Sequence, residues 1–258
     1  MSAALLLPSL AARAYDPNAL WNIVHGKCVP NQLANGDPKP CVEVDLKNGV
    51  ERGYAVLKDI RGATQYLLIP TQRIVGIESP ALVAPDAENY FADAWNARGF
   101  VEEAVGRALP IDTLSLAVNS EFARTQNQLH IHIDCILPDV RATLLKLRAS
   151  IGANWAPLPE PVGGYGYWAM RVMRPTLDGA NPFKLLADGV PDARADMKLR
   201  TLVVVGMRFE ADAPGFVVLQ DRADLLHFDF GAGARLQDHD CALAQGLSAT
   251  PADATDAR

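Results

Sequence analysis

The clearest alternation of apolar and polar residues lies between residues 126 and 136, in the stretch QNQLHIHIDCI. Leu129, Ile131 and Ile133 recur at every second position, which predicts a β-strand with one apolar face. Because side chains alternate across a strand, the opposite face carries only polar residues. These are Gln128, His130, His132 and Asp134. Two imidazoles on one face of a strand need an explanation that a merely solvated surface does not provide.

Similar patterns predict the other elements of the chain. Apolar or alternating runs predict strands at 42–46, 53–59, 64–70, 113–119, 167–173, 200–209 and 215–222. Helical spacing predicts helices at 16–29, 86–105, 138–151 and within 181–197. In the first of these, Asp16 is the expected N-cap and Pro17 the first helical residue. Strands followed by a long helix, two strands and a helix favour an α+β fold, an antiparallel sheet with helices packed on it.

The chain divides into four segments on this pattern. Residues 1–15 form a leader, 16–152 a first half that contains the histidines, 153–242 a second α+β half packed on the first, and 243–258 a disordered tail poor in apolar bulk. A loop rich in Pro and Gly, 157–165, marks the boundary. The second half could be a degenerate copy of the first, with 215–222 in place of the histidine strand. Alternatively, the likeness is one that any two α+β segments share.

The N-terminus and the cysteines favour export. MSAALLLPSLAARA is a short apolar run that ends in a small-x-small pattern, typical of a secretory signal whose basic part is missing; a disordered cytosolic leader is the alternative. Cys28 and Cys41 flank VPNQLANGDPKP, which predicts a loop that a disulfide would close. No C-x-x-C or paired Cys/His spacing of a zinc site occurs.

Charge and composition exclude several classes. The formal net charge is −6 with Lys and Arg scattered, which disfavours nucleic acid as a partner. The ordinary globular composition makes a largely disordered or membrane-spanning chain a poor interpretation.

Three explanations of the histidine pair remain: a structural or solvated face, a metal site, and covalent catalysis. H-x-H can supply two metal ligands with Asp134 or a distant histidine as the third, but the other histidines lie in unremarkable contexts and are assigned structural roles. These are His25, His227 and His239. Covalent catalysis accounts for more of the local sequence, because imidazole has a pKa of about 6.5 and is nucleophilic near neutral pH. One imidazole could attack a diphosphate phosphorus, and the second could bind its oxygens or protonate the leaving oxygen.

The same residues carry a family resemblance. QLHIHID resembles the H-x-H-x-H signature of the histidine triad superfamily, with Gln128 at the first position, and TQYLLIPTQRI is similar to the strand upstream of that signature. Within that superfamily, four segments together resemble the bacterial CDP-diacylglycerol pyrophosphatase family from about Leu20 to Cys241. They are LWNIVHGKC, QYLLIPTQRIVGIESP, RTQNQLHIHIDCILPDVR and QDHDC.

The resemblance implies a fold and a reaction. The first half would be a histidine-triad-like catalytic half, and the enzyme would hydrolyse CDP-diacylglycerol to CMP and phosphatidate, a reaction of phospholipid metabolism, without a metal or other cofactor. His130 would be the nucleophile that forms a cytidylyl intermediate, and His132 the third triad residue. Gln128 would orient its neighbours from the first triad position, and the polar residues before the strand, Asn119, Thr125 and Gln126, are themselves candidates for binding the substrate. The resemblance also implies a periplasmic enzyme, associated with the inner membrane through its N-terminus, and a Cys135–Cys241 disulfide.

Two alternatives stay open at this point. A histidine-triad hydrolase could act on soluble nucleotide diphosphates, or the protein could be a non-catalytic nucleotide-binding protein of the envelope. An apolar pocket wall beside His130 would favour the lipid substrate, and a closed polar pocket would favour the soluble one. Acyl and base preference and oligomeric state are not readable from the sequence.

Overall fold

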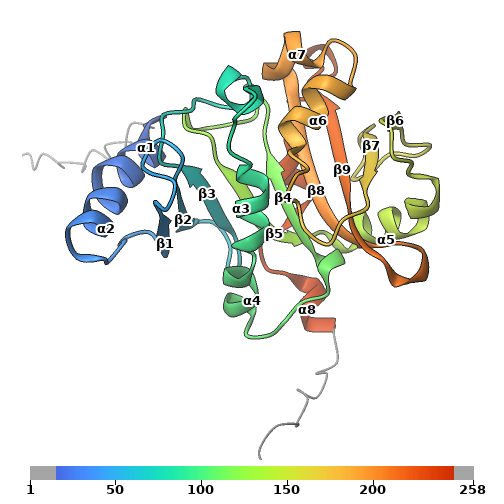
Figure 1. Cartoon of the computed structure of the whole chain (residues 1–258). Helices are drawn as coiled ribbons and strands as arrows, with labels where there is room; N and C mark the ends of the chain where they lie inside the picture. Colours follow the sequence, from blue (N-terminus) through green and yellow to red (C-terminus); the bar gives the residue numbers. More distant parts are fainter. Residues whose placement is uncertain (1–15, 247–258) are drawn as a thin grey trace, which may run out of the picture.

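A ten-stranded antiparallel sheet forms the centre of the computed structural model, which describes residues 16–246 (Figure 1). The predicted leader, residues 1–15, and residues 247–258 lie outside the described part. The α+β prediction is therefore confirmed. The strands are β1 (Glu43–Asp45), β2 (Tyr54–Lys58), β3 (Tyr66–Pro70), β4 (Leu114–Val118), β5 (Ile131–Ile136), β6 (Ala156–Pro157), β7 (Trp168–Val172), β8 (Arg200–Arg208), β9 (Pro214–Arg222) and β10 (Gln237–Asp238).

The strand order is β1-β2-β3-β5-β4-β8-β9-β7-β6, and the short β10 pairs with the remaining part of β5. The β4–β8 pairing joins the two predicted halves edge to edge, so that a single sheet runs through both. Outward from that pairing, β5, β3 and β2 on one side match β9, β7 and β6 on the other. This symmetric order supports the proposal that the second half derives from a copy of the first.

Helices cover the two faces of the sheet. They are α1 (Ala19–Ile23), α2 (Val29–Asn35), α3 (Tyr90–Asn96), α4 (Gly99–Val105), α5 (Pro138–Leu147), α6 (Pro182–Gly189), α7 (Ala193–Asp196) and α8 (Ala242–Gly246). On one face, apolar residues of α3, α4 and α6 pack on β5, β4, β8 and β9 in one large core cluster, in front of the sheet in Figure 1. On the other face, α1 and α2 cover β2 and β3, whereas α5 covers β8 and β9. Neither of these two layers covers the part of β5 between them, and a pocket lies there.

The symmetric position in the second half holds no imidazole. His132 pairs with Ala117, Ala117 with Val203, and Val203 with Leu219, so these four side chains share one face of the sheet. Leu219 is fully buried in the core cluster formed with α5. The imidazole of His132 therefore has no counterpart at Val203 or Leu219 in the second half.

One loop prediction and two helix predictions were wrong. The stretch after Cys28 is helix α2 and not a loop, because Pro30 is tolerated in a first helical turn and the left-handed Gly36 ends the helix only later. The predicted helix 86–105 is two helices, α3 and α4, with Arg98 at the break. The first helix starts at Ala19 with Asn18 as N-cap, followed by a π-helical turn over Val24–Cys28.

The C-terminal end of the described chain returns to the first half. Helix α8 continues to Gly246, into the segment expected to be disordered, because Ala244 packs in the large core cluster. Both expected disulfides, Cys28–Cys41 and Cys135–Cys241, are present. The second one ties the segment around β10 to the histidine strand.

Candidate active site

The predicted histidines lie at the wall of a cavity of about 480 Å³. Regular pairing of β5 starts at Ile131, so His130 is the residue just before the strand and His132 is its second residue. The cavity lies on the face of β5 between α1 and α5. Its polar wall consists of Asp16, Lys58, Asp59, Arg61, Gln65, Asn119, Thr125, Gln126, His130, His132 and His239.

The tautomer of His130 follows from one hydrogen bond. Its Nδ1 lies 2.8 Å from the backbone carbonyl oxygen of Gln128. Because a carbonyl oxygen can only accept, Nδ1 carries the proton and Nε2 is left with a lone pair. Burial also lowers the pKa of His130, which keeps the ring neutral near pH 7. The ring is thus held in the form that can act as a nucleophile through Nε2.

His132 is packed against His130, with ring centroids 4.9 Å apart and ring planes at 68°. Burial, and next the neighbouring His130, lower the pKa of His132 well below its ordinary value. Among residues 16–246, neither ring nitrogen of His132 has a hydrogen-bond partner, although both are buried. Such a neutral ring can donate one hydrogen bond and accept one from a molecule in the cavity.

Asp134, the last of the four polar residues on the strand face, is fully buried. Its Oδ2 lies 2.7 Å from Nδ1 of His239, and its Oδ1 accepts hydrogen bonds from the Thr64 hydroxyl at 2.6 Å and the Cys135 amide at 2.9 Å. Burial raises the pKa of Asp134, and these hydrogen bonds oppose that effect. The carboxylate therefore has a partner for each oxygen.

The structure brings the other predicted site residues to the cavity with one exception. Asn119, Thr125 and Gln126 line it. The Gln126 side chain also accepts from the Leu20 amide and donates to the Asp16 carbonyl, which holds α1 over the cavity. Gln128 lies behind the wall, fully buried.

The Gln128 amide nitrogen donates to the backbone carbonyl oxygens of Pro70 and Gln72 at 3.0 and 2.9 Å. Its contact with the site runs through its backbone carbonyl, which holds His130.

The metal interpretation finds no ligand set in the described chain. Residues 16–246 contain no group of three or more His, Cys, Asp or Glu side chains that could hold a metal ion. Asp134, one of the two candidates for the third ligand, is directed to His239 and Thr64. Positive charge at the cavity comes from Lys58 at the end of β2 and Arg61 on the turn that follows.

One wall of the cavity is apolar. It is formed by Ala19, Leu20 and Ile23 of α1, Leu57 of β2, Leu67 of β3 and Ile60 on the turn between these strands. Ile60 lines the cavity and is 99% exposed, so it stands at the edge of this wall.

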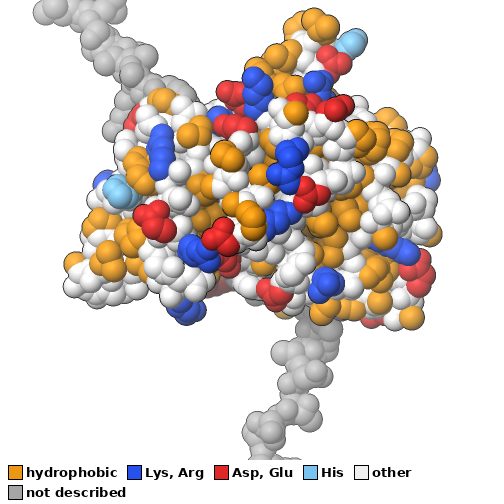
Figure 2. Space-filling view, turned by 45° about the horizontal axis from the view of Figure 1, so that its top comes forward, with side chains coloured by type: hydrophobic (Ala, Val, Ile, Leu, Met, Phe, Trp, Pro, Cys, Tyr) orange, Lys and Arg blue, Asp and Glu red, His pale blue; other side chains and the backbone are white. Residues whose placement is uncertain are grey.

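A second apolar surface lies on the segment 225–230. Leu226 and Phe228 are 89% and 79% exposed, and Leu225 and Phe230 are partly exposed beside them. The Phe230 carbonyl oxygen lies within hydrogen-bond distance of the Ser120 hydroxyl, next to the cavity residue Asn119. Figure 2 shows hydrophobic side chains gathered beside a histidine on a projection at the top of the molecule.

His239 is the site residue that sequence reasoning missed. It was assigned a structural role because nothing around it has a spacing of its own, but the structure places its ring in the cavity wall with His130 and His132. The available signal was the segment QDHDC, which is one of the family-like segments and contains both His239 and Cys241.

Two comparisons with known proteins agree. A family model described as CDP-diacylglycerol pyrophosphatase matches residues 15–245. A CDP-diacylglycerol pyrophosphatase from Yersinia pestis is 41% identical to this chain over 229 residues, which is 89% of this chain and 86% of the relative. All polar residues of the cavity wall lie inside the matched range.

Proposed function

Because this chain belongs to the CDP-diacylglycerol pyrophosphatase family, we propose that it hydrolyses CDP-diacylglycerol to CMP and phosphatidate in the cavity that contains His130 and His132. The family makes the protein a hydrolase of a diphosphate bond. The observation that supports this cavity as the site is the tautomer of His130, whose Nδ1 is bound to a carbonyl oxygen and whose Nε2 has a lone pair.

The proposed first step is covalent. Nε2 of His130 attacks the phosphorus that carries the cytidine, an N–P bond forms, and the bridging P–O bond breaks. Phosphatidate leaves with the electron pair of that bond. In the second step, water attacks the same phosphorus, the N–P bond breaks, and CMP is released with His130 in its starting form. One water is consumed in each cycle. The resemblance of residues 128–134 to the histidine triad signature supports this covalent route.

Neutral hydrogen-bond donors support the transition state in this proposal. His132 donates a hydrogen bond to a phosphoryl oxygen, because its low pKa leaves it neutral and its ring nitrogens have no partner among residues 16–246. Asn119 and Thr125 line the cavity as further candidates for oxygen contacts. Donors fixed in a water-poor site count for more than donors in bulk water.

The apolar wall favours a lipid over a soluble nucleotide diphosphate. Leu20, Ile23 and Leu67 stand on the same cavity as the histidines, and Ile60 lies exposed at its edge. A wall of this kind offers apolar contact to the acyl-glycerol part while the histidines contact the diphosphate. A substrate without acyl chains would gain nothing from it.

We also propose that the enzyme works at a membrane surface in an oxidising compartment, the periplasmic side of the inner membrane. The two disulfides favour a compartment outside the cytosol. Within residues 16–246, no helix is long and apolar enough to cross a bilayer. The exposed Leu226 and Phe228 can instead enter the headgroup region, because burying apolar area at an interface is favourable.

The decisive test is release of CMP from CDP-diacylglycerol in detergent micelles. The wild type and His25→Ala, a control histidine stacked on Trp21 away from the cavity, should both be active. His130→Ala should retain its fold and lose essentially all turnover, and His132→Ala should lose about 10²–10⁴-fold. Labelled cytidylate should be trapped on the wild type as an acid-labile, base-stable adduct and be absent from His130→Ala. Full activity of His130→Ala would contradict the assignment.

Two further measurements separate the alternatives. Activity should survive EDTA; loss with EDTA and recovery with zinc would favour a metal site. Binding to anionic vesicles should weaken in Leu226→Asp and Phe228→Asp but not in Leu33→Asp, a control on α2 whose side chain is 67% exposed. Equal binding of all three variants would refute the membrane contact.

A further inference from the structure

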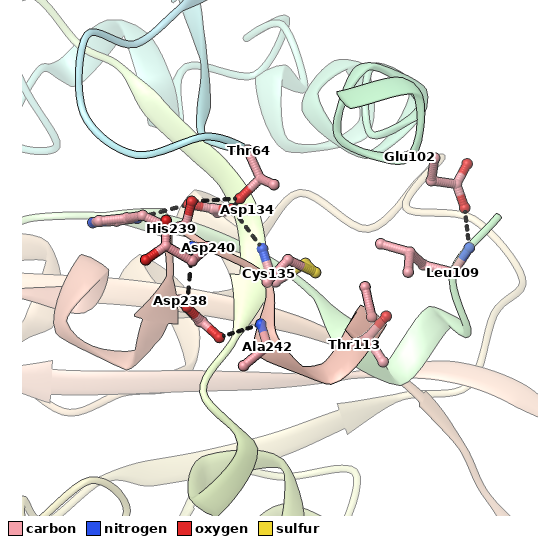
Figure 3. The surroundings of a disulfide bond; sticks show 12 residues. Thr64, Glu102, Leu109, Thr113, Asp134, Cys135, Asp238, His239, Asp240 and Ala242 are labelled. Atoms are coloured by element: carbon pink, nitrogen blue, oxygen red, sulfur yellow. Dashed lines mark hydrogen bonds and ion pairs between the residues drawn. A yellow bond between two sulfur atoms is a disulfide. The ribbon is translucent and has the colours of Figure 1, made fainter. Parts of the chain in front are cut away.

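His239 reaches the cavity by tertiary structure alone. It follows β10, which pairs antiparallel with β5, so that Asp238 stands opposite Cys135. Figure 3 shows the consequence: the His239 ring and the Asp134 carboxylate point toward each other beside the disulfide. A histidine 105 residues away from Asp134 in sequence thus becomes its hydrogen-bond partner.

Several independent contacts hold His239 in this position. Its carbonyl oxygen accepts from the backbone amides of Ala63 and Thr64 at 2.9 and 3.1 Å. Gly62 packs so closely that an added Cβ would lie 2.3 Å from the Cβ of His239. The Cys135–Cys241 disulfide fixes the chain two residues further on. A histidine with no role beyond surface packing would not need its backbone fixed from two neighbouring segments.

The ring orientation leaves one nitrogen for chemistry. A carboxylate can only accept, so Nδ1 of His239 carries the proton shared with Oδ2 of Asp134, and Nε2 is the other nitrogen of a ring that lines the cavity. The Gln65 amide nitrogen lies 3.2 Å from the same Nδ1, but with Nδ1 protonated both atoms are donors, so the ring is held by Asp134. This is the arrangement by which a buried carboxylate orients an acid–base histidine.

The three cavity histidines differ in protonation. The hydrogen bond to Asp134 and the negative charge of that residue raise the pKa of His239 above its ordinary value, with only 35% of the side chain exposed. Burial lowers the pKa of His130 and His132. Near pH 7, His239 is therefore the cavity histidine best able to hold a proton and release it.

We propose that His239 is the catalytic acid–base residue of this enzyme and that Asp134 is its positioning residue, an inference that rests on the proposed function. Protonated His239 gives its Nε2 proton to the departing phosphatidate oxygen as the P–O bond breaks. Neutral His239 then takes a proton from the water that attacks the cytidylyl phosphorus as the N–P bond breaks. The proton that His239 takes from water replaces the one that it gave to phosphatidate, so His239 ends each cycle protonated. His132, which the sequence made the candidate acid, keeps the role of hydrogen-bond donor.

The experiment compares variants of the full chain in the CMP-release assay. His239→Gln should lose about 10²–10⁴-fold in kcat, whereas His25→Gln should match the wild type. In His239→Gly, added imidazole should restore part of the rate, because it can occupy the vacated space and exchange the proton. The same imidazole should not rescue His239→Gln, whose side chain fills that space. A residue with a purely structural role would not respond to imidazole.

The pH profile tests the positioning role of Asp134. The groups that face His239 are Asp134 and His132 on β5, Asp59 and Arg61 on the turn after β2, and Asp238 on β10. In the wild type, kcat/KM should fall as pH rises through the raised pKa of His239. Asp134→Asn removes the charge that raises this pKa, so the falling limb should move to lower pH. Its folding is checked by thermal unfolding and by retention of the Cys135–Cys241 disulfide.

Outcomes for the inference and for the proposed function can be told apart. If the wild type does not release CMP from CDP-diacylglycerol, the proposed function fails. If the wild type is active and His239→Gln matches it, the inference alone is overturned. The inference also fails if imidazole leaves His239→Gly inactive while thermal unfolding and the intact disulfide show that this variant is folded. If Asp134→Asn does not fold, Thr64→Val is used in its place, because it removes a hydrogen-bond donor to the same carboxylate. The falling limb of its kcat/KM profile against pH should then differ from that of the wild type. An unchanged limb in Thr64→Val overturns the positioning role of Asp134.

Discussion

The two disulfides should stabilise the fold unequally, and the structure lets the difference be worked out. Cys28–Cys41 closes a separation of 13 residues, and Cys135–Cys241 one of 106 residues. A cross-link restricts the unfolded chain more when the loop is longer. The loop-entropy relation at 25 °C gives about 2.9 kcal/mol for the separation of 13 and about 4.8 kcal/mol for that of 106. Replacing the long-range pair should therefore cost about 2 kcal/mol more.

The perturbation is a pair of double variants, Cys28→Ala/Cys41→Ala and Cys135→Ala/Cys241→Ala. All four cysteines are buried, with exposed fractions of 3% or less, so the lost side-chain packing is similar in both variants and largely cancels in the comparison. The free energy of unfolding is measured by urea titration with circular dichroism and fluorescence as independent probes. Coincident curves and a shared m-value are needed before the two values are compared.

Activity gives a second, independent readout of the same variants. The long-range disulfide adjoins Asp134 and holds the segment of His239, whereas the short-range one lies under α1 and α2. In folded protein, kcat should drop in Cys135→Ala/Cys241→Ala and stay near the wild-type value in Cys28→Ala/Cys41→Ala. An equal loss of stability in the two variants, or a larger loss for the short loop, would refute the reasoning from loop length.

Three other predictions follow from buried polar groups. His239→Gln should lower the free energy of unfolding most below pH 6.5. The difference in this free energy from the wild type should shrink as pH rises through the raised folded pKa of His239. Urea titrations across pH 5–9 that show a constant difference would contradict this. Burial raises the pKa of Asp93 to about 7, so Asp93→Asn should be more stable than the wild type at pH 8 and equal to it below pH 3.8, by thermal unfolding at both values. Gln128→Leu removes the donor to two carbonyl oxygens and should lose about 1–3 kcal/mol in urea titration. Its folded fraction should keep its turnover, because the backbone of residue 128 holds His130; a stable but inactive Gln128→Leu would point to a direct role of the amide.

Local pattern was sufficient for the strands and for the histidine face. The period of two in residues 129–136 depends only on alternation along one strand, and β5 has the predicted direction of its side chains. The same holds for Leu114–Val118 and Arg200–Arg208, whose apolar runs formed β4 and β8. The family-like segments also carried the reaction class, because the residues that resemble the family lie in these same local stretches.

Local pattern failed where competing signals were close in strength. The stretch 29–40 has turn-forming residues, but its first part continues a helix that packs Val29 in the cluster with Leu20 and Val24. The burial of that apolar face outweighs the weak preference of Asn and Pro for turns. A sequence pattern records both tendencies and gives no weight to the packing that decides between them.

The complete site was decided by tertiary structure. His130 and His132 were readable from the strand, whereas the Asp134–His239 contact depends on the pairing of β10 with β5 and on a disulfide that spans 106 residues. Gln128 was expected in the site, and only the position of β3 shows that its side chain is used to bind the backbone there. Alternation along a strand is local and can be read from one segment. Contacts between distant segments depend on how the whole core packs, so the acid–base partner of the histidine strand became visible only in the folded chain.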